Sequence, residues 1–270
     1  MADNILKILA DAARERVAED KKKISMEDMV KKALSMECNT DYETGFIVEQ
    51  ALKKEGISFI CEVKKASPSK GLIAPNFPYV EIAKEYETAG AACISVLTEP
   101  TRFLGDDRYL QEIVDNVATP VLRKDFTVDA YQIYQAKVLG ASMILLICSL
   151  LDEDTIREYI GICDTLGLSA LVETHDEDEI AMAVRAGARI IGVNNRNLKD
   201  FTVDVHNSER LRKLVPPDVL FIAESGIRTA KDIKVLYDAG VNGVLIGETL
   251  MRSPDKKAML EELRKGCAKG

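Results

Sequence analysis

From residue 58 onward, the chain alternates between short apolar runs and longer amphipathic segments whose apolar positions recur at helical spacing. The apolar runs predict eight strands, at residues 58–65, 92–98, 120–125, 143–149, 169–174, 190–195, 219–225 and 243–247. The amphipathic segments predict helices at 79–89, 107–116, 129–139, 153–166, 177–186, 207–214 and 230–239, and a last helix at 254–265. Several of these helices end at a glycine directly before the next strand, as short α-to-β turns require: Gly90, Gly140, Gly167, Gly187 and Gly240.

Strand–helix units in this number and order indicate a protein of the α/β class that closes into a parallel (β/α)8 TIM barrel. An open doubly wound sheet is the alternative. Such a sheet normally has a glycine-rich phosphate turn after its first strand, and the chain contains neither a GxGxxG sequence nor a P-loop. The pattern therefore favours the barrel.

The residues before the first strand are predicted to be mainly helical. Leu6, Leu9, Ala13 and Val17 recur at helical spacing, and a capping box that starts at Ser25 predicts a second short helix. We expect a single domain of residues 1–270, with an N-terminal helical extension of residues 1–57 that covers one end of a barrel of residues 58–270. A helical arm that binds a partner is the alternative.

Composition narrows the class of partner. The net charge is -8 and no basic stripe is present, so we expect no binding to nucleic acid or to a membrane. The six cysteines form no CxxC pair and there are only two histidines, which gives no zinc or iron–sulfur signature. No apolar run is long enough to span a bilayer. We therefore expect a cytoplasmic protein with reduced cysteines and no metal.

The end of the first predicted strand places an acid and a base on one face. Side chains alternate along a strand, so Glu62 and Lys64 point to the same side while Cys61 and Lys65 point to the other. A charged pair at the end of a buried strand costs stability and often marks chemistry. The alternative is a strand end that frays into solvent and exposes both charges.

Polar residues also end most of the other predicted strands, and in a barrel these ends meet at one mouth. The residues concerned are Lys124, Glu173, Asn194, Arg196, Ser225 and Gly247. Alternation predicts that Lys124 and Glu173 point into the barrel. It also predicts an inward Ser225, on the face of Phe221 and Ala223, and an outward Glu224. Asp125 is likewise predicted to point outward.

Two lysines and two carboxylates at one mouth suit general acid–base chemistry. A lysine Schiff base and a purely structural ion-pair network are the alternatives. Phosphate binding is a second prediction, because barrels often bind phosphate at the loops after strands seven and eight. The residues expected to hold phosphate are Ser225, Gly226, Gly247 and Glu248, together with Lys64 and Ser67. The alternative is that these glycines only form turns.

Other residues give weaker signals. Phe103 and Phe126 lie in loops after strands two and three, where they suit either a wall for an aromatic ligand or loop packing. His175 follows Glu173 closely; a role in capping the next helix is favoured over an active-site role. His206 is predicted to be a surface residue.

Taken together, the motifs resemble the indole-3-glycerol phosphate synthase family over nearly the whole chain. The strings that match are Glu62-Val-Lys64-Lys-Ala-Ser67-Pro-Ser, Ser95-Val-Leu-Thr-Glu99, Arg123-Lys124-Asp-Phe126, Leu171-Val-Glu173, Gly192-Val-Asn194-Asn-Arg196-Asn-Leu198 and Ala223-Glu-Ser225-Gly226-Ile. Glu248 stands where relatives carry Ser in places. Any one string is weak evidence, whereas their order on successive strands is specific.

The resemblance implies closure of the indole ring of 1-(2-carboxyphenylamino)-1-deoxyribulose 5-phosphate, with loss of carbon dioxide and water and with no metal or organic cofactor. It implies that Lys124 is the general acid on the ribulose carbonyl and Glu173 the base of the dehydration. Lys64 then either contacts the phosphate or donates a proton to the departing hydroxyl.

The remaining roles also follow from the resemblance. Glu62 and Asn194 would orient these groups, and Arg196 would face the substrate carboxylate. The apolar side of the cleft would be lined by Phe103, Phe126, Leu145 and Leu198. A monomer is expected, and association with other enzymes of the tryptophan pathway stays open.

Two other functions are alternatives to this interpretation. Phosphoribosylanthranilate isomerase is a similar barrel, but that family uses a Cys on strand one and an Asp on strand six. Here Cys61 is predicted to face away from Glu62, and strand six ends in Asn194. A non-catalytic barrel that binds a phosphorylated ligand would explain the phosphate residues but not Lys124 together with Glu173.

Overall fold

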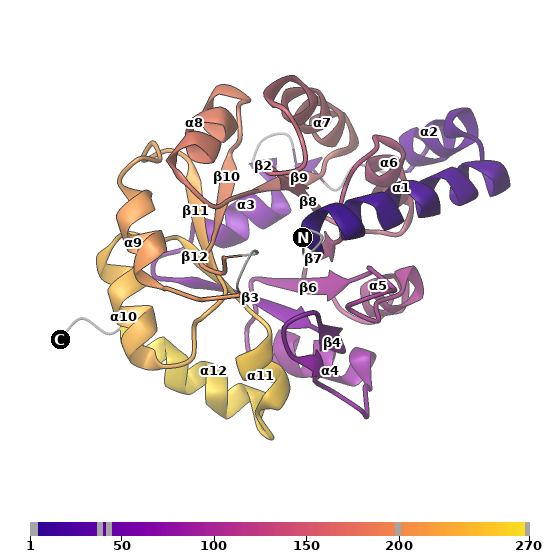
Figure 1. Ribbon diagram of the computed structural model, residues 1–270. Helices are drawn as coiled ribbons and strands as arrows, with labels where there is room; N and C mark the ends of the chain where they lie inside the picture. Colours follow the sequence, from indigo (N-terminus) through magenta and orange to yellow (C-terminus); the bar gives the residue numbers. More distant parts are fainter. Residues whose placement is uncertain (1–4, 37–39, 42–44, 198–200, 268–270) are drawn as a thin grey trace.

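The computed structural model describes residues 5–36, 40–41, 45–197 and 201–267. Parallel strands in it close into a barrel in chain order, with the last strand beside the first (Figure 1). They are β3 (Ser58–Val63), β6 (Cys93–Leu97), β7 (Val121–Lys124), β8 (Met143–Ile147), β9 (Ser169–Thr174), β10 (Ile190–Asn194), β11 (Leu220–Glu224) and β12 (Gly243–Ile246). The predicted TIM barrel is confirmed.

A ring of helices surrounds the barrel. It consists of α4 (Tyr79–Thr88), α5 (Asp107–Val114), α6 (Tyr131–Val138), α7 (Glu153–Leu166), α8 (Glu177–Arg185), α9 (His206–Arg212), α10 (Ala230–Asp238) and α12 (Lys256–Arg264), with a 3-10 turn, η1 (Lys265–Cys267), after it. The glycines predicted to end helices all have positive φ, from 69° at Gly167 to 88° at Gly187. Only glycine adopts this conformation readily, which explains why it recurs before the strands.

The loops at the mouth contain two short elements. The β3–α4 loop forms a small antiparallel hairpin of β4 (Ala66–Ser67) and β5 (Gly71–Leu72), which the sequence did not predict. A short helix, α11 (Glu248–Arg252), follows the last strand. Both elements place loop residues beside the C-terminal ends of the strands.

Apolar side chains form two separate layers on the two faces of the strands. Ile60, Leu122, Leu171 and Leu245 belong to a cluster inside the barrel. Alternate residues, such as Cys61 on β3, pack outward against the helices. This alternation confirms that Glu62, Lys124 and Glu173 continue the inner face.

The predicted alternation is wrong for β11. Ile222 belongs to the inner cluster, whereas Phe221 and Ala223 pack outward, so Glu224 points into the barrel. The prediction treats Ser225 as an inward-facing strand residue, but Ser225 has φ 67° and does not have the strand conformation. Because the strand is apolar on both faces, nothing else in its sequence identifies the inner face.

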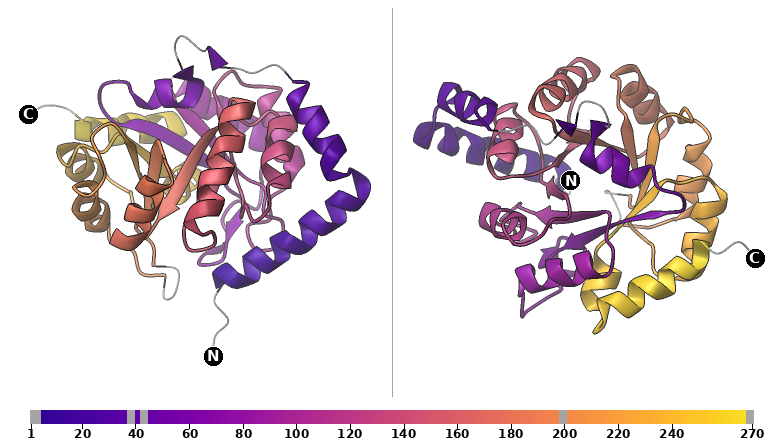
Figure 2. Two further views of the ribbon diagram at one scale, coloured as in Figure 1. Left: turned by 90° about the horizontal axis from the view of Figure 1, so that it is seen from above. Right: turned by 180° about the vertical axis from the view of Figure 1, so that it is seen from behind.

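The N-terminal helices cover both ends of the barrel. In Figure 2 (left), α1 (Ile5–Lys23) and α3 (Ile47–Leu52) lie at opposite ends of the barrel. Val48 and Leu52 of α3 join the inner cluster from the N-terminal ends of the strands, and Leu6 of α1 joins it from the mouth. A two-stranded pair, β1 (Thr40–Asp41) with β2 (Gly45–Phe46), precedes α3.

The helix α2 (Met26–Leu34) begins at Ser25, whose hydroxyl accepts the amide of Asp28, as the capping box predicts. It packs with the C-terminal part of α1 against α6, where Val17 and Met29 surround Tyr131. No helix in the described part of the chain is both long and apolar enough to cross a bilayer.

Candidate active site

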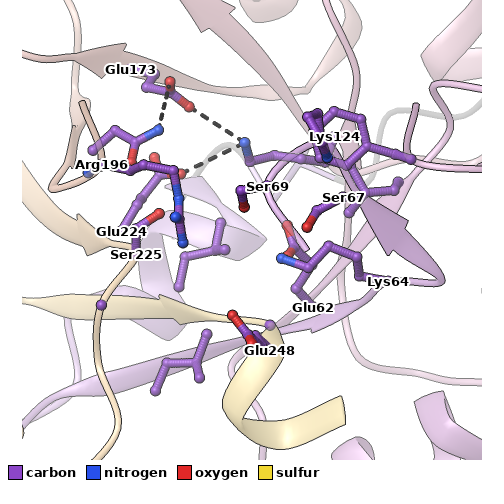
Figure 3. A pocket seen from close by; sticks show the side chains of 18 of the residues that line it. Glu62, Lys64, Ser67, Ser69, Lys124, Glu173, Arg196, Glu224, Ser225 and Glu248 are labelled. Atoms are coloured by element: carbon purple, nitrogen blue, oxygen red, sulfur yellow. Dashed lines mark hydrogen bonds and ion pairs between the residues drawn. The ribbon is translucent and has the colours of Figure 1, made fainter. Parts of the chain in front are cut away.

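A cleft of about 370 Å³ opens at the C-terminal ends of the strands, beneath the start of α1. Every predicted site residue that the structure describes lines it (Figure 3): Glu62, Lys64, Ser67, Phe103, Lys124, Phe126, Leu145, Glu173, Asn194, Arg196, Ser225, Gly226, Gly247 and Glu248. Leu198 lies outside the described residues. The fold therefore brings together groups that are far apart in the sequence.

The cleft contains two lysine–carboxylate groups. Nζ of Lys124 lies 3.3 Å from Oε2 of Glu173 and 3.7 Å from Oε2 of Glu224. Nζ of Lys64 donates to Oε2 of Glu62 at 2.5 Å. The cleft thus holds several acids and bases within reach of one small molecule.

The charged groups in this cluster shift one another's pKa values. Burial alone would lower the pKa of Lys124, but Glu173 and Glu224 outweigh burial and raise that pKa above its usual value. Burial likewise opposes ionisation of Glu173, yet Lys124 and His175 hold its pKa below the usual range. Lys124 is therefore a charged donor and Glu173 a carboxylate acceptor, as acid–base chemistry requires.

The pKa of Glu224 is shifted in the opposite direction from that of Glu173. Burial and the neighbouring carboxylates Glu173 and Glu62 raise its pKa to about 8, in spite of Lys124. Sequence reasoning missed this residue, because it placed Glu224 on the outer face. Glu224 would have been identified if the inner face of β11 had been assigned correctly.

Asn194 and Arg196 organise the side of the cleft next to Glu173. Nδ2 of Asn194 donates to Oε1 of Glu173 at 3.1 Å, and Oδ1 of Asn194 accepts the amide of Arg196 at 3.0 Å. A single amide side chain thus fixes both the carboxylate and the loop after β10. Asp125 pairs with Arg16 of α1 at 2.8 Å.

On the opposite side of the cleft, the backbone lies close to side chains of the site. Gly226 has φ 84°, and a Cβ at Gly247 would lie 2.2 Å from Oε2 of Glu62 and 2.7 Å from Nζ of Lys64. The missing side chain at residue 247 therefore makes room for the charged pair. Lys70, at the turn of the hairpin, lies 3.9 Å from Glu248.

An apolar wall lines the rest of the cleft. The rings of Phe103 and Phe126 lie 6.2 Å apart, and Leu145 rises from the inner core. Ile5, Leu6 and Leu9 of α1 complete this wall, which the sequence did not predict. Leucines at helical spacing look the same whether they pack on a core or cover a cleft, so the sequence held no signal for this role.

His175 is not the cap of α8, although a capping role is favoured by the sequence. The N-cap is Asp176, whose side chain accepts the amide of Glu179, and His175 precedes it and donates its own amide to Oε2 of Glu179. Its ring is also an active-site neighbour, because Nε2 lies 3.4 Å from Oε1 of Glu173. His206 is exposed, as predicted, and pairs with Glu209 on its own helix.

The geometry also bears on the isomerase alternative. Cys61 is fully buried in the outer layer, and burial raises the pKa of its thiol. A protonated thiol that faces the helices is unsuited to proton transfer inside the cleft. Strand β10 offers the neutral Asn194 where that alternative needs a carboxylate.

Comparisons with known proteins point in one direction. The family model described as "Indole-3-glycerol phosphate synthase" matches residues 6–263. A protein of that name from Ruminiclostridium cellulolyticum is 57% identical over 260 residues, which cover 96% of this chain and 98% of the relative. Another, from Lachnoclostridium phytofermentans, is 52% identical over 267 residues, with 96% and 98% covered.

Solved structures give the same fold at low identity. A 3-hexulose-6-phosphate synthase from Salmonella typhimurium superposes with a TM-score of 0.65 at 13% identity, covering 78% of this chain and 98% of that one. At this identity the likeness concerns the fold alone.

Proposed function

The chain belongs to the indole-3-glycerol phosphate synthase family and is a carboxy-lyase of tryptophan biosynthesis; from this premise we propose how its residues divide the reaction. The substrate is a phosphorylated sugar joined to an anthranilate ring. It must bind with its ring against an apolar wall and with its ketose carbonyl near a proton donor. The cleft offers both in one space (Figure 3).

Lys124 is assigned as the general acid of ring closure. When the aromatic carbon attacks the ribulose carbonyl, the carbonyl oxygen gains negative charge and needs a charged donor. Lys124 stays protonated because Glu173 and Glu224 stabilise its ammonium group. Loss of carbon dioxide then restores the aromatic ring, and this step needs no strong base.

Glu173 is assigned as the base of the dehydration that follows. Asn194 holds one of its oxygens and Lys124 the other, so the carboxylate is fixed in orientation and stays ionised. Lys64, across the cleft, is placed either to protonate the departing hydroxyl or to contact the phosphate. Its partner Glu62 holds the Lys64 ammonium in place.

The two ends of the substrate would be held by different groups. Ser225, with the amides near Gly226, Gly247 and Glu248, would bind the phosphate, and Ser67 lies on the adjoining hairpin. Arg196 would face the anthranilate carboxylate. Phe103, Phe126 and Leu145 would pack against the ring.

The observation that carries these assignments is the contact between Lys124 and Glu173, 3.3 Å apart at the centre of the cleft. Lys124→Ala should fold and bind the substrate but lose turnover by about 10²–10⁴-fold. The assay follows indole fluorescence after addition of the ribulose phosphate substrate, with low background because the chain has no Trp. Indole production at the wild-type rate by Lys124→Ala would refute the role of Lys124.

We also propose that the protein acts as a cytoplasmic monomer folded as one domain. The acid, the base and the apolar wall that the proposed reaction needs are all present in this chain, which supports turnover without a second subunit. The described cysteines are unpaired, as expected in a reducing compartment. Sedimentation at enzymatically active concentrations tests the monomer, and a specific complex with another tryptophan-pathway enzyme would appear as a faster species.

A further inference from the structure

The imidazole of His175 lies directly behind the carboxylate that faces the cleft. Its Nε2 is 3.4 Å from Oε1 of Glu173, yet His175 is not among the residues that line the cleft. The two groups are not aligned for a hydrogen bond, so Nε2 has no hydrogen-bond partner within the described part of the chain. A buried ring nitrogen in this state needs a physical explanation.

The other side of the ring is held firmly. Nδ1 of His175 lies 3.0 Å from Oε2 of Glu179 on α8. Oε1 of Glu179 accepts the hydroxyl of Ser149, from the loop after β8, at 2.5 Å. Glu173, His175 and Glu179 therefore form a continuous carboxylate–imidazole–carboxylate chain, which runs from the cleft into the surrounding protein.

We propose that His175 is a positioning residue for Glu173: as an imidazolium between two carboxylates, it keeps Glu173 ionised and correctly oriented to accept a proton from the substrate. This inference rests on the proposed role of Glu173 as a base. His175 itself does not touch the substrate, because the Glu173 carboxylate stands between its ring and the cleft.

The charges around the ring support the imidazolium form. Burial would lower the pKa of His175, but Glu179 and Glu173 raise it, and Glu224 of β11 adds to their effect where its own carboxyl is ionised. On the cleft side, Glu173 also faces Lys124 of β7, so its ionisation is supported by two cations. By linkage, Glu173 and His175 must each favour the charged form of the other.

The first test is the pH profile of turnover in His175→Asn. Without the imidazolium the pKa of Glu173 rises, so the acidic limb of kcat should move to higher pH. On that limb kcat should fall about tenfold, while KM changes by less than about twofold. An acidic limb at the wild-type pH would overturn the proposal.

The matched control is His206→Asn. His206 is exposed, pairs with Glu209 and is not among the residues that line the cleft. Its substitution should leave the pH profile unchanged. A limb that moves equally in both variants would also overturn the proposal, since the shift would then be unrelated to Glu173.

The second test does not depend on turnover. The chain has two histidines, so His206→Asn leaves His175 as the sole imidazole for a titration by NMR. In that background Glu173→Gln should lower the pKa of His175, and so should Glu179→Gln. A titration that is unchanged by Glu173→Gln would disprove the coupling. Retained turnover in Glu173→Gln would instead disprove the proposed function of Glu173, so the two failures are distinguishable.

Discussion

Oε1 of Glu224 occupies the space in which a side chain at Gly192 would stand. The two residues lie on the neighbouring strands β11 and β10, and a Cβ at Gly192 would be 2.3 Å from that oxygen. Oε1 has no hydrogen-bond partner within the described residues, and Oε2 lies 3.7 Å from Nζ of Lys124. A buried carboxyl with so little support favours its neutral form, in line with its raised pKa of about 8.

We expect Glu224→Gln to stabilise the protein at alkaline pH and to change its stability little at about pH 4. The pKa of Glu224 in the folded state, about 8, exceeds the ordinary value of 4.5. Between these values the folded state holds a proton that the unfolded state has released, so the wild type loses stability as pH rises through this range. Glutamine does not titrate, so the variant escapes this loss.

Urea unfolding of both proteins at acidic, neutral and alkaline pH checks this prediction. The difference in unfolding free energy should grow with pH up to about pH 8 and then level off. A constant difference across the whole range would show that Glu224 has an ordinary pKa in the folded protein.

The strands and their polar ends could be predicted from the sequence because both leave a strong local pattern. An apolar run followed by Lys124 or Glu173 has one interpretation once a parallel barrel is assumed. Glu224 could not be placed in the same way. Its strand is apolar on both faces, and the residue used to choose the inner face, Ser225, has left the strand conformation.

The roles of α1 and of two glycines could not be predicted for another reason. Leu6 and Leu9 were expected only to belong to a helix that covers one end of the barrel, and nothing in their spacing shows that a cleft lies beneath them. Gly192 and Gly247 leave room for Glu224 and Glu62, respectively. Such close approaches join separate strands, so they leave no local trace in the sequence.

Gly247→Ala should impair turnover much more than stability. The backbone of Gly247 has φ -114°, which alanine adopts without strain, but its Cβ would displace the ends of Glu62 and Lys64. Since both side chains are flexible, we expect a loss of stability below about 1 kcal/mol. The value of kcat/KM should fall about 100-fold if Lys64 acts on the substrate.

The control for this substitution is Gly161→Ala on α7, where a Cβ would meet no atom within 4 Å. Alanine in an exposed helix should add about 0.5–1 kcal/mol of stability and leave kcat/KM unchanged. Normal turnover in Gly247→Ala would mean that the position of the Glu62–Lys64 pair is unimportant.

Ser225→Gly tests the role of the Ser225 hydroxyl separately from the role of its backbone. Ser225 has φ 67°, a left-handed conformation that costs a non-glycine residue about 1 kcal/mol. Glycine removes this strain but loses more entropy on folding, so stability should change by less than about 1 kcal/mol. If the hydroxyl binds phosphate, KM should rise about tenfold or more, since a hydrogen bond to a charged group contributes about 1.5–3 kcal/mol.

Leu104→Gly is the matched control, because Leu104 has φ 54° but does not line the cleft. It should relieve the same kind of strain with no change in KM. An unchanged KM in Ser225→Gly would leave phosphate binding to the backbone amides alone.

Arg16→Leu tests whether α1 must be fixed to the barrel for the cleft to work. The guanidinium of Arg16 reaches both oxygens of Asp125, at 2.8 and 2.9 Å, and only 2% of the Asp125 side chain is exposed. Arg123 remains 3.8 Å away in the variant, so we expect a loss of about 2 kcal/mol rather than the larger cost of an isolated buried charge. Arg14→Leu, on the same helix in an exposed pair with Asp11, should change stability by less than about 0.5 kcal/mol.

The effect of Arg16→Leu on turnover follows from the position of α1. The start of this helix provides Ile5, Leu6 and Leu9 to the apolar wall, so a looser α1 should weaken substrate binding. Val17 still packs with Met29 against Tyr131, which should keep the helix attached. We therefore expect a higher KM with a smaller change in kcat, measured by the indole fluorescence assay. A fall in kcat at unchanged KM would show instead that Asp125 acts mainly through its neighbour Lys124.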